Sequence, residues 1–189
     1  PWDGRMRITV RLPSPATIKI ALRIPGWCEG AMVRVNERVI DIDTRPSSFA
    51  TISREWRDGD QIDLDLPMPP RLVEANPYVE EARQHVAVQR GPIVYCLESC
   101  DLPSDVRLSD VAIRAGAALR VGAPIEGLAG APAIECEGVA RVSPAWSADQ
   151  LYRPLGKPSL RTIPLQFVPY FAWDNRTPCE MTVWIPLSY

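Results

Sequence analysis

The fold is decided by the stretch His85-Val86-Ala87-Val88-Gln89-Arg90-Gly91-Pro92-Ile93-Val94-Tyr95-Cys96-Leu97-Glu98. Two short runs rich in β-branched and aromatic residues lie on either side of an Arg-Gly-Pro interruption, a pattern that predicts strand, kink and strand. Pro92 has no N–H to donate and Gly91 tolerates a bulge, so strand pairing is expected to break there. We expect the residues before this stretch to form one antiparallel unit with it, and those after Asp101 to form a second.

Upstream of this stretch, apolar and polar residues alternate, as is typical of half-buried strands. The first two alternating runs are separated by Pro13-Ser14-Pro15, so we expect them to pair as a hairpin. Asp58-Gly59 is a strong hairpin signal, because glycine tolerates a positive φ. The alternating runs cover residues 5–12, 17–24, 33–36, 39–42, 49–56 and 61–66.

Downstream, the strand signal weakens between residues 101 and 160 and sharpens again over 161–169 and 181–186. Twenty prolines lie between the apolar runs, about twice the usual proportion, which disfavours long helices. Residues 74–84 are the best place for a short helix, although Pro77 favours a loop. We predict an all-β chain with little helix, built as two antiparallel β-sandwich (jelly-roll-like) domains. The predicted domains are residues 1–100 and 101–189, with the last strands able to pack back on the first domain.

Composition excludes several classes of function. The net charge is −2, so there is no basic footprint for a nucleic acid. No apolar run approaches the ~20 residues that span a membrane. The chain opens Pro-Trp-Asp-Gly, without an initiator methionine or a signal peptide, and we therefore expect a fragment of a longer protein.

The five cysteines are odd in number and irregularly spaced, unlike a disulfide framework. We expect free, mostly buried thiols and a cytoplasmic protein. A metal site is the less favoured alternative, because Cys96 and Cys100 are separated by three residues and only His85 offers an imidazole. Calcium is also disfavoured, since the aspartates at 58, 60, 63 and 65 lack the spacing of a calcium loop. The cysteines are Cys28, Cys96, Cys100, Cys136 and Cys179.

The sequence singles out no catalytic residue. There is one histidine, at the start of a predicted strand, where a structural role is favoured over a catalytic one. Glycoside hydrolysis needs two carboxyl groups facing each other across roughly 5 to 10 Å, but spacing selects no pair among the candidates. We therefore assign no catalytic residue, no metal ligand and no cofactor to this chain. The carboxylates considered are Asp3, Glu98, Asp101, Asp174 and Glu180.

The tryptophans suggest a binding function. There are six in 189 residues, and flat aromatic faces beside polar groups suit sugar rings. The best candidate sugar-binding residues are Trp173, Asn175 and Arg176. Core and inter-domain packing, with Arg176 stacked or ion-paired, is the favoured alternative interpretation.

A series of short motifs, spread in order over nearly the whole chain, resembles the C-terminal β-sandwich region of glycoside hydrolase family 127, the β-L-arabinofuranosidases. Each motif is short, and their common order makes the resemblance specific. The motifs are Pro1-Trp2-Asp3-Gly4, Arg23-Ile24-Pro25-Gly26-Trp27, Arg54-Glu55-Trp56-Arg57-Asp58-Gly59-Asp60, Leu66-Pro67-Met68, the Arg90 to Glu98 run, Pro169-Tyr170, Ala172-Trp173, Asn175-Arg176, Met181 and Val183-Trp184-Ile185-Pro186.

The resemblance implies that the chemistry lies elsewhere. In the family, an (α/α)₆ barrel before this region carries the cysteine nucleophile, its zinc-binding Cys and Glu partners, and the acid/base Glu. The barrel's adjacent Cys-Cys pair has no match here, and Cys96 aligns with the sandwich. The resemblance therefore implies a parent protein that hydrolyses β-L-arabinofuranosides with retention, and zinc bound only in the barrel.

We accordingly expect a non-catalytic accessory region, without activity of its own, from a glycosidase of carbohydrate metabolism. Its expected partner is the (α/α)₆ barrel of the same parent chain; a homodimer contact and an arabinose-containing oligosaccharide are further candidate partners. The alternative is an independent carbohydrate-binding module. A row of exposed tryptophans would favour the module, and buried tryptophans at a domain junction would favour the accessory region.

Overall fold

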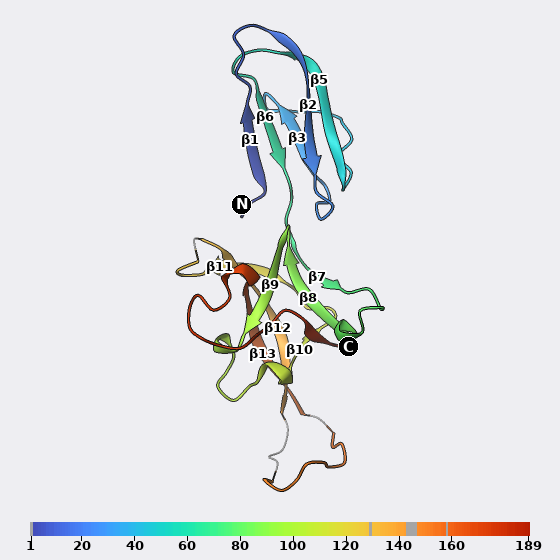
Figure 1. Cartoon of the computed structure of the whole chain (residues 1–189), viewed down its shortest axis with the longest axis vertical. Coiled ribbons are helices and arrows are strands. Elements are labelled where there is room, and N and C mark those ends of the chain that lie inside the picture. The colour runs from blue at the N-terminus through green and yellow to red at the C-terminus, as the bar shows by residue number, and fades with distance from the viewer. Residues whose placement is uncertain (1, 129, 143–146, 158) are drawn as a thin grey trace. The chain divides into compact units, whose positions relative to one another are not determined.

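The computed structural model describes residues 2–128, 130–142, 147–157 and 159–189. Its contacts divide the chain into two compact units, Pro1–Pro69 and Pro70–Tyr189 (Figure 1). This division differs from the predicted boundary between residues 100 and 101. The reason is that the 85–98 stretch pairs with strands from the C-terminal part of the chain and not with the strands before Pro70. The last strands do pack back on this stretch, within the second unit.

The first unit contains two antiparallel sheets. The four-stranded sheet has the order β1-β6-β3-β4, and the two-stranded sheet pairs β2 with β5. The two sheets contribute to one apolar core, in which Trp56 of β5, Ile24 of β2 and Ile62 of β6 are fully buried. The strands are β1 (Arg5–Thr9), β2 (Ala16–Ile24), β3 (Met32–Val35), β4 (Arg38–Val39), β5 (Ser48–Trp56) and β6 (Gln61–Asp65).

Two hairpin predictions for this unit were wrong. Strands β1 and β2 do not pair with each other, since β1 pairs with β6 and β2 with β5. The turn at Asp58-Gly59, where Gly59 has φ +85°, connects strands of different sheets. Alternation fixes which face of a strand is buried, but it does not select the neighbouring strand. A tight hairpin at Asn36-Glu37, with both residues at positive φ, pairs β3 with β4.

The second unit is organised around a closed ring of six strands. In order around the ring they are β8, β9, β13, β12, β10 and β15, and β15 pairs with β8 to close it. Only the β10–β15 pairing is parallel among these. The unit's strands are β7 (Pro70–Glu74), β8 (His85–Arg90), β9 (Ile93–Glu98), β10 (Val111–Arg114), β11 (Arg120–Pro124), β12 (Pro132–Val142), β13 (Ser159–Pro169), β14 (Met181–Thr182) and β15 (Ile185–Ser188).

The deciding stretch lies at the centre of this unit. Strands β8 and β9 form a tight hairpin in which Arg90 faces Ile93, and Gly91 turns the chain at φ +56°. Side chains pointing into the ring form the core, with Tyr95, Leu97 and Phe167 all fully buried. The Tyr95 hydroxyl donates a hydrogen bond to the Pro132 carbonyl oxygen at 3.2 Å. The Arg90-Gly91-Pro92 interruption is therefore the hairpin turn that connects β8 to β9.

The prediction of an all-β chain with little helix is confirmed. The helical elements among the described residues are four three-residue 3₁₀ turns: η1 (Glu80–Ala82), η2 (Ser99–Asp101), η3 (Leu108–Asp110) and η4 (Tyr170–Ala172). The sandwich or jelly-roll description is not confirmed, because pairing in the second unit closes a ring. None of the helices in these described segments has the length and apolar character to cross a membrane.

Candidate functional site

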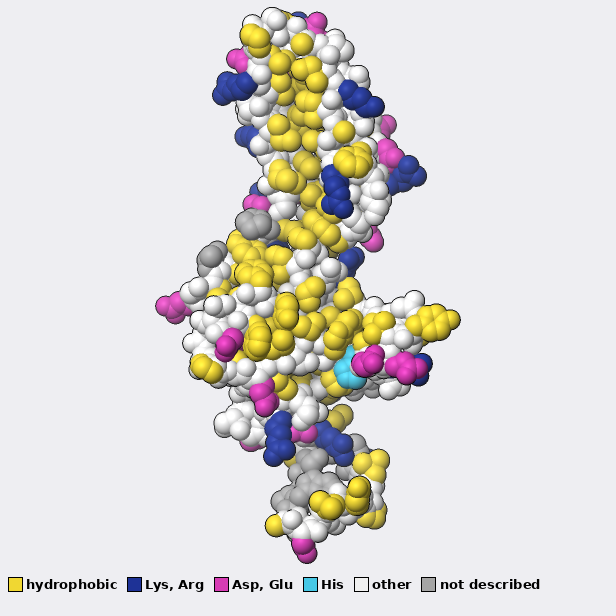
Figure 2. All heavy atoms as spheres, in the orientation of Figure 1, with side chains coloured by type: hydrophobic (Ala, Val, Ile, Leu, Met, Phe, Trp, Pro, Cys, Tyr) yellow, Lys and Arg dark blue, Asp and Glu magenta, His cyan; other side chains and the backbone are white. Residues whose placement is uncertain are grey.

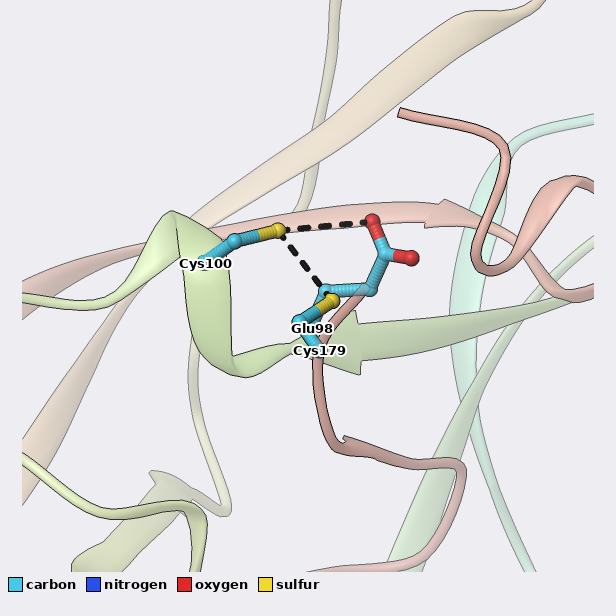
Figure 3. Close-up of side chains that lie close together, drawn as sticks. All are labelled: Glu98, Cys100 and Cys179. Carbon is cyan, nitrogen blue, oxygen red and sulfur yellow. Dashed lines mark hydrogen bonds between the residues drawn. The ribbon is translucent and has the colours of Figure 1, made fainter. Parts of the chain in front are cut away.

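The candidate site lies where two segments far apart in sequence meet. Strand β9 ends at Glu98 and runs into η2, while the chain after η4 returns through residues 173–182 and pairs β14 with the end of β9. The Ser99 N–H donates to the Glu180 carbonyl oxygen at 2.8 Å, and the Glu180 N–H donates to Ser99 Oγ at 3.0 Å. These backbone contacts bring Glu98, Cys100 and Cys179 together (Figure 3).

Arg176 holds two carboxylates at this point. Its Nη2 donates to Glu98 Oε2, and its Nη1 donates to Asp101 Oδ1 at 3.0 Å. The other oxygen of Glu98 accepts the Asp174 N–H at 3.1 Å. These hydrogen bonds, with Asp101 the larger contributor, hold the pKa of Arg176 above its ordinary value. Glu98 is 1% exposed, and both of its carboxylate oxygens accept hydrogen bonds.

The two cysteines lie beside this ion pair. Cys179 Sγ is 3.3 Å from Cys100 Sγ, and Cys100 Sγ is 3.9 Å from Glu98 Oε2. Partial desolvation of its sulfur, the hydrogen bond from Cys179 and the charge of Asp101 raise the pKa of Cys100 to about 12. Both residues are free thiols in the structure, and Cys100 is therefore protonated at neutral pH.

These donors do not fit a zinc ion, although Glu98, Cys100 and Cys179 place their ligand atoms within 4.8 Å of one another. The guanidinium of Arg176 already binds Glu98 Oε2 and lies 3.7 Å from Cys100 Sγ. A divalent cation at this point would face that positive charge at close range. We therefore assign no zinc to this cluster.

A second feature is an open hollow of about 910 Å³ on the same unit, lined by Trp173 and Trp184 together with His85, Arg107 and Thr182. Trp173 is 41% exposed and Trp184 is 37% exposed. Aromatic faces and polar side chains thus lie around one depression. Figure 2 shows how hydrophobic side chains gather over the second unit.

The structure separates the three predicted sugar-binding residues. Trp173 lines the hollow, the exposed Asn175 donates from its side chain to the Trp173 carbonyl oxygen at 3.3 Å, and Arg176 turns to Glu98 and Asp101. The alternative interpretation of Arg176 as ion-paired is confirmed. Sugar binding by the three residues stays a prediction.

The tryptophans divide between core and surface. Trp56 is buried in the first unit, and Trp27 packs against the same core, while Trp173 and Trp184 are exposed. Trp146 lies outside the described residues. The sequence did not indicate that Trp184 lines the same hollow as Trp173. It also gave no sign that Cys100 lies beside Cys179, because no local spacing connects residues 79 positions apart. The prediction of mostly buried thiols is confirmed, since Cys28, Cys96 and Cys136 are buried.

Comparison with known families gives two matches that cover nearly the whole chain. Residues 1–68 match a family model described as the β-L-arabinofuranosidase GH127 middle domain. Residues 70–186 match one described as the glycoside hydrolase family 127 C-terminal domain. The border between the matches coincides with the division at Pro69 and Pro70.

Individual relatives agree with these matches. The chain is 34% identical to a non-reducing end β-L-arabinofuranosidase from Bifidobacterium longum, over 97% of this chain and 28% of that protein. A crystal structure of a GH127 β-L-arabinofuranosidase from Geobacillus stearothermophilus T6 is 38% identical, with a TM-score of 0.89 over 100% of this chain and 29% of the other. The GH127 β-arabinofuranosidase BT3674 is 29% identical with a TM-score of 0.82, covering 100% of this chain and 30% of that one. The chain thus spans less than a third of the length of these relatives.

Proposed function

Since the chain belongs to glycoside hydrolase family 127, we propose that it is the non-catalytic middle and C-terminal region of a longer β-L-arabinofuranosidase-like glycoside hydrolase. The observation that carries the proposal is the extent of the match. The chain corresponds to the middle and C-terminal domains of the family and to 28–30% of the relatives' length. In this proposal the remaining length holds the (α/α)₆ barrel, its zinc and its cysteine nucleophile. The proposed reaction of that longer protein is hydrolysis of β-L-arabinofuranosides.

The ion pairs of Glu98 and Asp101 support a structural role for this region. Glu98 and Asp101, both close in sequence and space, are held by one guanidinium. A glycosidase needs one carboxyl group that protonates the leaving group and another that acts on the opposite side of the sugar. Carboxylates neutralised by the same arginine suit structural stabilisation instead.

Unpartnered groups on the second unit support docking to a further part of the protein. Nε and Nη1 of Arg90 are buried and have no hydrogen-bond partner among the described residues, although Arg90 is only 9% exposed. Exposed apolar side chains also gather near η4 and β14–β15, where Tyr170, Trp173 and Trp184 are 48%, 41% and 37% exposed. Such patches commonly mark protein contacts. We propose that the catalytic barrel covers the surface that presents Tyr170, Trp173 and Trp184.

The proposed architecture keeps the β-sandwich for the first unit. Its support is the single core that the two sheets of that unit share. For the second unit, the closed ring is the description that the pairing supports.

The docking proposal is tested by mixing this chain with a separately produced barrel of a full-length homologue and measuring the dissociation constant by calorimetry. Trp184→Asp and Tyr170→Asp should each weaken binding at least tenfold, because each places a charge in an apolar contact. Leu155→Asp is the control, since Leu155 is 82% exposed and lies in a loop between β12 and β13. Absence of binding by the unmodified chain would contradict the proposal.

The second candidate function is carbohydrate binding, favoured by the hollow that Trp173 and Trp184 share. Arabinose-containing oligosaccharides are the proposed ligands, with the sugar's apolar face on a tryptophan. Titration calorimetry with such oligosaccharides tests it, and Trp173→Ala should abolish any binding. The buried Trp56, which cannot reach a ligand, provides no support for this candidate.

A further inference from the structure

We propose that Cys100 and Cys179 form a disulfide bond that fastens the returning segment 173–182 to the end of β9. Their sulfur atoms are 3.3 Å apart. A disulfide has an S–S distance of about 2.05 Å, so the two sulfurs need to approach by little more than ~1 Å. Figure 3 shows the two sulfur atoms close together beside Glu98, one from η2 and one from the segment before β14.

The residues next to the two cysteines hold the two segments together. Ser99 precedes Cys100 and Glu180 follows Cys179, and these two neighbours exchange hydrogen bonds of 2.8 and 3.0 Å. One residue further, Met181 of β14 pairs with Glu98 of β9. The two cysteines therefore cannot drift apart without breaking a ladder and a side-chain contact, and the bond can form without refolding the unit.

Accessibility distinguishes this pair from the other thiols. Cys100 is exposed and Cys179 is partly exposed, whereas Cys28, Cys96 and Cys136 are buried. A small oxidant in solution thus reaches this pair first. The charge of Arg176 also disfavours metal binding, the main competing use of two adjacent thiols, because its Nη2 lies 3.7 Å from Cys100 Sγ.

The oxidant is a low-molecular-weight disulfide such as oxidised glutathione. The Cys179 thiol loses its proton, and the thiolate attacks one sulfur of glutathione disulfide, which breaks that S–S bond and releases one glutathione thiolate. Cys100 Sγ then attacks Cys179 Sγ in the mixed disulfide, giving up its own proton as the second glutathione leaves. Two protons pass from the cysteines to the two glutathione thiols, so one disulfide is reduced as one forms.

The bond would close a loop of 79 residues. Closing a long loop restricts the unfolded chain and stabilises the folded one, although strain can reduce the gain. For the second unit we expect the melting temperature to rise by about 5–10 °C on oxidation. The segment that carries Trp173 would be fixed at the same time.

The test is to incubate the full chain with oxidised glutathione and map its peptides by mass spectrometry without reduction. We expect a cross-linked peptide pair containing Cys100 and Cys179, lighter than the two free peptides by two hydrogen atoms. Cys28, Cys96 and Cys136 should remain free as internal controls. The melting temperature should rise, fall back with dithiothreitol, and stay unchanged by oxidant in Cys100→Ser and in Cys179→Ser.

Two results would overturn the proposal. One is recovery of Cys100 and Cys179 unlinked, or each as a separate glutathione adduct, after prolonged incubation. The other is binding of one zinc ion by the reduced chain that Cys100→Ser abolishes, which would make the pair a metal site. Because mapping reads the covalent bond directly, it gives a result even for a variant that folds poorly.

Discussion

At the residue scale, Arg176 is the side chain on which the candidate site depends most. It neutralises Glu98, which is 1% exposed, and Asp101. We predict that Arg176→Ala lowers the free energy of unfolding by about 3 kcal/mol, because it leaves a buried carboxylate unpaired. Chemical denaturation followed by circular dichroism measures this change.

The control is Arg161→Ala, which removes an ion pair of the same unit with the exposed Asp105. This variant should unfold at nearly the same denaturant concentration as the unmodified chain. Equal changes in the free energy of unfolding for the two substitutions would mean that the Glu98–Arg176 pair stabilises the fold no more than an exposed ion pair does.

The buried thiols predict how stability depends on pH. Burial raises the pKa of Cys96 to about 12, with a further contribution from Glu98, and burial raises the pKa of Cys136 to about 11. An unfolded thiol ionises at a pKa near 8.5, so above that pH the unfolded state loses protons that the folded state keeps. Stability should therefore be fully present below about pH 8.5 and fall as pH rises toward 11 to 12.

Urea unfolding at intervals between pH 7.5 and 10.5, with dithiothreitol present, measures this dependence. Cys96→Ala should give a shallower decline than the unmodified chain, even if its stability at pH 7.5 is lower. Parallel declines in the two proteins would show that Cys96 does not contribute.

Sequence reasoning at this scale succeeded where the signal was local. The run Ile93-Val94-Tyr95-Cys96-Leu97-Glu98 predicted a strand from its β-branched and aromatic composition, and β9 has these bounds. It could not identify the partners of Arg176, because Glu98 lies 78 positions away. Such a contact depends on β14 pairing with β9, which no spacing along the chain encodes.

At the scale of elements, the ring depends on close approach between β12 and its neighbours. Gly138 of β12 lies opposite Ile113 of β10 and Ile163 of β13. A Cβ at this position would lie 2.3 Å from Leu165 Cδ1 and 3.0 Å from the Ala112 carbonyl oxygen. The glycine is therefore required by packing.

We predict that Gly138→Ala lowers the free energy of unfolding by about 1–3 kcal/mol, the usual cost of overpacking a well-packed core. Gly116→Ala is the matched control, since nothing lies within 4 Å of its added Cβ. Thermal melting of both variants separates the outcomes. An unchanged melting temperature in Gly138→Ala would mean that the Leu165 side chain moves aside without loss of stability.

The elements also show where sequence patterns stop being informative. Alternation correctly predicted the strands of the first unit, and β2 with β5 forms a nine-residue ladder. Alternation did not predict which strands pair with each other, since β1 pairs with β6, which lies far from it in the sequence. The division at Pro69 and Pro70 also differs from the predicted boundary, because β8 and β9 pair with strands from the C-terminal part of the chain.

At the scale of the whole molecule, the central claim is that this chain supports a catalytic region without performing the reaction. The match to the middle and C-terminal domains of family 127, over less than a third of the relatives' length, is its main support. Nε and Nη1 of Arg90, which are buried without a hydrogen-bond partner among the described residues, are consistent with a region that contacts another domain.

The most direct test is the release of chromophore from an aryl β-L-arabinofuranoside by this chain alone and by a full-length homologue, each assayed with added zinc. We predict turnover by the full-length homologue and none by this chain at equal concentration. Turnover by this chain would contradict the account and direct attention to Glu98, Asp101 and Asp174.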